Sequence, residues 1–145
     1  MDSIGLAAAL AALVVGGAVG VWRRRTNGRV REQVGARVDP AVLTALGVPA
    51  GRPTLLQISS AFCAPCRALR RISAEVAGLV PGVQHIEVDA ESHLDEVRAL
   101  DVWRTPSLFV LEADGRIARR ASGVPTKAQL IAALGELETI AGGAR

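Results

Sequence analysis

The chain has 145 residues, which is enough for one domain of ordinary size and a short accessory segment. Its net charge is +3, but the basic excess is confined to residues 1–37, where six arginines stand against two acidic residues. Residues 38–145 carry eleven basic and twelve acidic side chains. With only four scattered aromatic side chains, the chain lacks the basic, aromatic-rich face of a nucleic-acid-binding surface, and we expect no nucleic acid partner.

The first predicted element is a membrane-spanning helix over residues 1–22. Residues 3–22 contain no charged side chain, and a helix of this length spans about 30 Å, the thickness of the hydrocarbon core. Trp22 closes the run and three arginines follow at once, which is typical of a membrane boundary. A cleaved signal peptide is the alternative, but a signal peptide carries its basic residues before the apolar run, and here they follow it.

Residues 23–37 are polar and arginine-rich, and they show no apolar periodicity. We interpret them as a basic juxtamembrane linker that lies in solvent close to anionic lipid headgroups, with the folded domain in residues 38–145. The lipid bilayer is therefore an expected partner. Because basic residues stay on the cytoplasmic side of a membrane, the charge distribution favours a single-pass cell-membrane protein with this domain in the cytoplasm.

From residue 38 on, short apolar runs alternate with amphipathic segments. Asp114-Gly115 between the last two predicted strands indicates a hairpin, and the earlier alternation of strands and helices indicates parallel pairing. The pattern predicts an α/β fold in which helices flank a small central mixed sheet. Strands are expected over residues 54–59, 83–89, 106–111 and 116–121, and helices over residues 39–46, 64–80, 92–100 and 126–141.

The only two cysteines, Cys63 and Cys66, lie three positions apart, where the first predicted strand of the domain gives way to a helix. Free backbone N–H groups and the helix dipole stabilise a thiolate at a helix N-terminus, so Cys63 is expected to be the exposed nucleophile. One turn of helix brings Cys66 beside it as the buried resolving thiol. Pro65 suits the first turn, Arg67 adds a positive charge, and Phe62 is expected to shield one side of the pair.

Other interpretations of the cysteine pair stay open from the residues alone. A zinc site needs four ligands, and only His85 and His93 remain, at a spacing that fits no zinc finger. A structural disulfide across so short a loop would add little stability. Two inert core cysteines are the last alternative. We favour a redox-active pair, with no metal and no bound cofactor.

Residues 38–141 resemble the thioredoxin family. The family opens a helix after a strand with Trp-Cys-Gly-Pro-Cys, and here the motif reads Phe62-Cys63-Ala64-Pro65-Cys66. Thr105-Pro106 matches the family's cis-proline dipeptide, and a cis bond is tolerated chiefly before proline. The resemblance implies that this dipeptide faces the cysteine pair and binds an incoming substrate strand. Gly123 matches the glycine before the last helix.

Two positions near the motif depart from the family pattern. The family's buried acidic residue, six positions before the first cysteine, falls on Gln57, which cannot accept the proton of Cys66. The family's lysine partner falls near His85, on the neighbouring strand. We consider two interpretations of His85: it partly replaces the missing proton acceptor, or it is an ordinary strand residue that meets solvent or a hydrogen-bond partner.

The resemblance implies a thiol–disulfide oxidoreductase that reduces disulfides in partner proteins with the Cys63–Cys66 dithiol, and the predicted N-terminal helix tethers it to a membrane. The chain has no nucleotide-binding motif, so its electrons are expected from an external donor, either a reductase or a membrane dithiol carrier. Anchored members of the family often act outside the cytoplasm, which makes an extracytoplasmic domain the alternative placement. A binding or redox-sensing module with little turnover is the alternative function, because Gln57 lacks the usual carboxylate.

Overall fold

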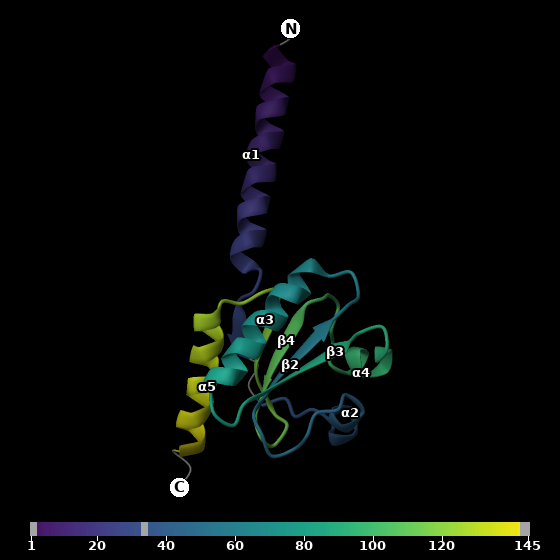
Figure 1. The fold of residues 1–145 in the computed structure, drawn as a ribbon. Coiled ribbons are helices and arrows are strands. Elements are labelled where there is room, and N and C mark those ends of the chain that lie inside the picture. Colours follow the sequence, from purple (N-terminus) through teal and green to yellow (C-terminus); the bar gives the residue numbers. More distant parts are fainter. Residues whose placement is uncertain (1–2, 33–34, 143–145) are drawn as a thin grey trace.

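A long helix and a mixed α/β domain make up the computed structural model, which describes residues 3–32 and 35–142 (Figure 1). The helix α1 (Ser3–Thr26) extends away from the domain, and its side chains are exposed from Ile4 to Arg25. It is long and apolar enough to cross a membrane, as the sequence predicts. It continues past the predicted end at residue 22 and includes the three arginines that follow.

A tight turn joins α1 to the domain. Gly28 has a φ of 79°, a left-handed conformation that favours glycine, and a Cβ atom there would lie 2.3 Å from the carbonyl oxygen of Val124. The N–H of Gly28 donates a 2.7 Å hydrogen bond to the carbonyl oxygen of Ser122. The end of α1 is therefore held against the end of the last strand.

Five strands form one mixed sheet in the order β1-β5-β4-β2-β3. The β2–β3 pair is parallel and the other neighbours are antiparallel, which confirms the predicted mixed sheet. The hairpin predicted at Asp114-Gly115 connects β4 to β5. In chain order the strands are β1 (Val30–Glu32), β2 (Thr54–Ser59), β3 (Gln84–Asp89), β4 (Ser107–Leu111) and β5 (Ile117–Ser122).

Helices cover both faces of the sheet (Figure 1). Because side chains alternate along a strand, Leu55 of β2 faces one cluster of apolar residues and Leu56 faces another. The helices α3 (Ala64–Leu79) and α5 (Lys127–Gly142) pack together over the first cluster. The helices α2 (Pro40–Ala45) and α4 (Leu94–Ala99) cover the second.

Local capping explains where two of these helices begin. The side chain of Asp39 accepts a 2.8 Å hydrogen bond from the N–H of Ala41 before α2. Thr126 and Gln129 form reciprocal hydrogen bonds at the start of α5, in the manner of a capping box. The sequence contains both signals, and the predicted starts of these helices agree with the structure to within one residue.

The interpretation of residues 23–37 as a solvated linker is wrong in part. Residues 30–32 form the edge strand β1, which pairs antiparallel with β5 and belongs to the domain. Val30 packs with the cluster under α3 and α5, whereas its neighbours Arg29 and Arg31 point to the other face of the sheet. A single apolar residue between arginines gives no visible periodicity, and charged residues are common on edge strands.

Candidate active site

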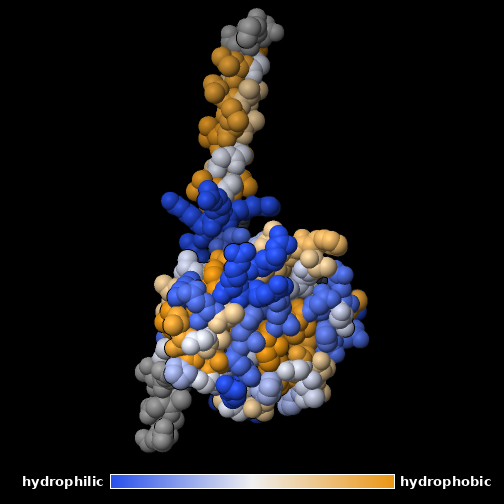
Figure 2. All heavy atoms as spheres, viewed as in Figure 1, coloured by the Kyte–Doolittle hydropathy of each residue, from blue (hydrophilic) through white to orange (hydrophobic). Residues whose placement is uncertain are grey.

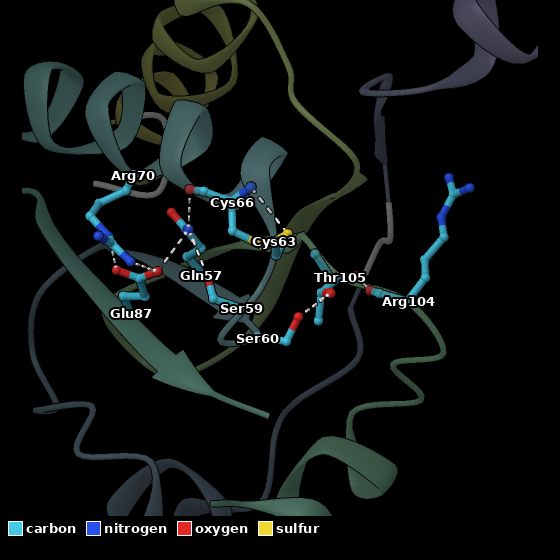
Figure 3. The surroundings of a disulfide bond; sticks show 10 residues. Gln57, Ser59, Ser60, Cys63, Cys66, Arg70, Glu87, Arg104 and Thr105 are labelled. Carbon is cyan, nitrogen blue, oxygen red and sulfur yellow. Dashed lines mark hydrogen bonds and ion pairs between the residues drawn. A yellow bond between two sulfur atoms is a disulfide. The ribbon is translucent and has the colours of Figure 1, made fainter. Parts of the chain in front are cut away.

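Cys63 and Cys66 lie where β2 leads into α3. Cys63 is the N-cap of α3, and the backbone N–H of Cys66 donates a 3.2 Å hydrogen bond to its Sγ. The two side chains form a disulfide (Figure 3). Cys66 is 1% exposed and Cys63 is partly exposed, so an incoming molecule reaches Cys63 first. After reduction, the same N–H stabilises a thiolate on Cys63.

The residues beside the pair contribute in different ways. Pro65 lies in the first turn of α3, where a backbone N–H is not needed, and Ala64 and Arg67 are exposed on the same turn. The side chain of Phe62 is 101% exposed. The expectation that Phe62 shields one side of the pair is therefore wrong: its ring projects into solvent and offers an apolar surface next to the disulfide.

The Thr105-Pro106 peptide bond is cis, as the family resemblance implies. Pro106 is buried directly before β4, and the next residue, Ser107, pairs with Ile58 near the end of β2. This register places the dipeptide beside the loop that leads into α3. The hydroxyl oxygens of Thr105 and Ser60 lie 3.0 Å apart in a hydrogen bond that ties the two loops together (Figure 3). The sequence analysis did not identify Ser60.

Gln57 is fully buried beneath α3, and its side-chain amide is the centre of a hydrogen-bond network. Its Nε2 lies 2.8 Å from Oγ of Ser59, 3.0 Å from the carbonyl oxygen of Cys66, and 3.3 Å from Oε1 of Glu87 (Figure 3). An amide has two N–H groups, so these three acceptors share two donors. The network links the backbone of the buried cysteine to a carboxylate.

Glu87 supplies this carboxylate from β3, where it is the direct neighbour of Gln57 in the parallel register. Arg70 of α3 donates to both carboxylate oxygens, with 2.9 Å from Nη2 to Oε1. Hydrogen bonding from Arg70 holds the pKa of Glu87 below its usual range and outweighs the opposing effect of partial burial. Glu87 is not among the site residues predicted from the sequence. The period of two along β3, which puts Glu87 on the same face as His85, is the signal that points to it.

His85 also contacts Gln57, because its Nε2 lies 3.2 Å from the amide Oε1. Burial lowers the pKa of His85, and this effect outweighs the charge of Glu87. Burial therefore favours the neutral imidazole, which is connected to Cys66 through the Gln57 amide. The role of His85 as a proton acceptor stays a prediction.

Together these parts define a protein suited to thiol–disulfide exchange. A mixed sheet carries a disulfide at a helix N-terminus, and a cis-proline lies beside that disulfide. The Cys63–Cys66 disulfide can be reduced to two thiols while two thiols of an outside partner are oxidised to a disulfide, or the reverse can occur. Among residues 3–32 and 35–142, no group of three or more His, Cys, Asp or Glu side chains could hold a metal ion.

A thioredoxin family model matches residues 46–136, and the chain belongs to the thioredoxin family. The chain is 27% identical over 62 residues to thioredoxin H4-1 of Oryza sativa subsp. japonica, which covers 43% of this chain and 47% of that protein. It is 24% identical over 67 residues to thioredoxin H4-2 of the same plant, covering 46% and 51%. The chain therefore spans about half the length of these relatives.

Solved structures confirm the predicted fold. A chloroplastic thioredoxin z superposes with a TM-score of 0.60 at 21% identity, over 71% of this chain and 93% of that one. The thioredoxin of Trypanosoma brucei brucei superposes with a TM-score of 0.58 at 18% identity, over 75% and 95%. Likenesses at this level of identity establish the thioredoxin fold.

Proposed function

We propose that this protein is a membrane-tethered thiol–disulfide oxidoreductase that reduces disulfide bonds in other proteins. The observation that carries the proposal is the environment of Cys63. The sulfur of Cys63 accepts a hydrogen bond from the N–H of Cys66 at the start of α3. Cys63 is also the more exposed of the two cysteines and lies beside the cis-proline loop. Family membership supports the same chemistry.

The proposed reaction begins with the reduced dithiol. The Cys63 thiolate attacks one sulfur of the substrate disulfide, so that a mixed disulfide forms and one substrate thiolate leaves. The Cys66 thiolate then attacks Sγ of Cys63, which releases the second substrate thiol and closes the Cys63–Cys66 disulfide. The substrate gains two electrons and two protons. An external reductase or membrane dithiol carrier must return the same number to the protein.

The position of the disulfide relative to α1 supports a role at a membrane surface. Gly28, just after α1, is hydrogen-bonded to Ser122 at the end of β5. Ser122 is paired with Ser107 at the start of β4, and Ser107 with Ile58 near the end of β2. Because neighbouring strands lie about 4.8 Å apart, these strand ends form one row. The disulfide lies at the N-terminus of α3, and with α1 in a bilayer this end of α3 is on the membrane side of the domain (Figure 1).

Reconstitution of the full chain in lipid nanodiscs tests the chemistry. With dithiothreitol as the electron donor, the protein should accelerate the reduction of insulin, and Cys63→Ser should abolish the acceleration. In a separate reaction without dithiothreitol, the reduced Cys66→Ser variant should accumulate a mixed disulfide between Cys63 and insulin, because no second thiol is present to release the insulin chain. Activity equal to that of buffer alone, and unchanged by Cys63→Ser, would instead favour a binding or redox-sensing module. This is the second candidate function, because Gln57 replaces the buried acidic residue that is usual in the family.

Labelling of Cys63 tests the proposed cytoplasmic placement of the domain. The Cys66→Ser variant leaves Cys63 as a free thiol, because the chain has only two cysteines. A membrane-impermeant maleimide should leave this thiol unlabelled in intact cells and label it after the cells are permeabilised. Labelling in intact cells would place the domain on the outer side.

A further inference from the structure

A pocket of about 440 Å³ lies between the end of α1 and the free edge of the sheet. Four arginines line it: Arg29 and Arg31 from the β1 segment, Arg120 from β5, and Arg104 from the loop before β4. Trp22 of α1 forms another wall, and no acidic residue is among the lining side chains. We call this the arginine pocket. Its size is in the range of small-molecule sites.

The sheet register explains why the arginines converge. Arg31 is the direct antiparallel partner of Arg120, and Arg29 lies two residues earlier on the same face. This face is the one that α2 and α4 cover farther along the sheet, where Phe109 pairs with Arg120. Like charges directly opposite each other on a sheet are destabilising. The fold therefore holds three guanidinium groups together at a cost that a bound anion would relieve.

The four arginines differ in whether their side chains already have hydrogen-bond partners. Arg120 is held in place, because it donates to the carbonyl oxygens of Leu100 and Asp101 and lies 4.9 Å from the centre of the Phe109 ring. In contrast, Arg29, Arg31 and Arg104 make no ion pair or side-chain hydrogen bond within the described residues. Their donors are free for a ligand.

The pocket lies beside the residue at which the apolar part of α1 ends. Trp22 closes the apolar part of α1 and is one wall of the pocket. With α1 across a bilayer, Trp22 lies at the interface, where phosphate groups of lipids are found. Figure 2 shows strongly hydrophilic surface around the base of α1, directly below its apolar part. The opening is therefore at the level of the headgroups.

We propose that the arginine pocket binds the phosphate group of an anionic phospholipid headgroup. Guanidinium groups match phosphate oxygens in geometry and charge, and several of them can engage one phosphate. That the phosphate belongs to a lipid depends on the membrane attachment proposed above. The affinity of the pocket for phosphate does not depend on that attachment. Because Arg104 directly precedes the cis dipeptide, the occupant contacts the loop that borders the disulfide.

The test uses the full chain in micelles of a neutral detergent at physiological salt. Binding of short-chain phosphatidylglycerol and of inorganic phosphate is followed by ³¹P NMR line width. Arg31→Gln removes a pocket arginine that makes no ion pair or side-chain hydrogen bond with residues 3–32 or 35–142. Arg25→Gln is the matched control, because Arg25 is an exposed arginine of α1 that does not line the pocket.

We expect saturable binding of phosphatidylglycerol that Arg31→Gln weakens about tenfold, the effect of one charged hydrogen bond. Arg25→Gln should weaken it by about twofold or less, because salt screens charges outside the site. Insulin reduction should be unchanged in Arg31→Gln, so this outcome is separable from failure of the proposed activity.

Four results would overturn the proposal. The first is no saturable binding, and the second is equal weakening by both substitutions. The third is that inorganic phosphate binds as tightly as the lipid, which would assign the pocket to a free anion. Tighter binding of a single-stranded oligonucleotide than of phosphatidylglycerol would likewise replace the lipid by a nucleic acid.

Discussion

Two regions of this protein differ in how their arginines are paired. Under the disulfide, Arg70 pairs with Glu87, and Gln57 connects that carboxylate to the backbone of Cys66. In the arginine pocket at the base of α1, Arg29 and Arg31 have no acidic partner in the part of the chain that the structure describes. The Arg70–Glu87 pair and Gln57 are satisfied within the fold, whereas Arg29 and Arg31 are available to the anion proposed above.

The largest expected effect comes from replacing Gln57, the centre of the hydrogen-bond network beneath the disulfide. Gln57→Leu leaves the oxygen atoms of Ser59, Glu87 and Cys66 without the amide donor at a fully buried position. We expect the free energy of unfolding to fall by about 2 kcal/mol, because unpaired buried polar groups keep their desolvation cost. Urea denaturation of the full chain in neutral detergent measures the change.

Arg31→Leu is the matched control for that experiment, because it removes a polar side chain from the arginine pocket. Its guanidinium makes no ion pair or side-chain hydrogen bond among the described residues, so its loss should change the free energy of unfolding by less than about 0.5 kcal/mol. Equal costs for the two substitutions would show that the network around Gln57 contributes nothing specific to stability.

A smaller effect is expected on the pKa of the buried thiol. In a Cys63→Ser background Cys66 is the sole thiol, and its thiolate absorbs in the ultraviolet. Adding Glu87→Gln leaves the Arg70 cation unbalanced and should lower the pKa of Cys66, whereas adding Arg70→Gln leaves an anion and should raise it. Each shift should be about one unit or less, because the pair acts through Gln57. Shifts in the same direction would contradict a role for this pair.

The smallest effect concerns stability in acid. Arg70 lowers the pKa of Glu87 in the folded state from its ordinary value of 4.5, so their interaction stabilises the fold at neutral pH. This contribution is lost as the pH falls through the lowered pKa and the carboxylate takes up a proton. The difference in unfolding free energy between the wild type and Arg70→Gln should therefore shrink between about pH 7 and about pH 3. A difference independent of pH would contradict it.

Features encoded by neighbouring residues could be predicted from the sequence. The apolar run of β2, the cysteine pair at the start of α3, and the Asp114-Gly115 hairpin each depend on a few consecutive positions, and the structure contains all three. The apolar stretch of α1 is predicted for the same reason. Local periodicity and turn chemistry are therefore sufficient for the order of the elements from α2 onward.

Features that depend on pairing between distant segments could not be predicted. Glu87 enters the site because it is the register partner of Gln57, and a shift of one residue would turn it to the other face. The strand β1 exists because β5 offers it a free edge, and its own residues show only Val30 between arginines. The arginine pocket is missed for the same reason, since its four arginines come from three separate segments.

The turn at Gly28 has a consequence for the kinetics of the proposed enzyme. Because residues 27–29 and one backbone hydrogen bond join α1 to the sheet, the domain has almost no free chain on which to sample the surrounding solution. A tether this short makes encounters depend on lateral diffusion and raises the effective concentration of anything held in the same bilayer. Turnover should then follow the number of partner molecules per unit area of membrane, and dilution of the cell contents should leave it unchanged.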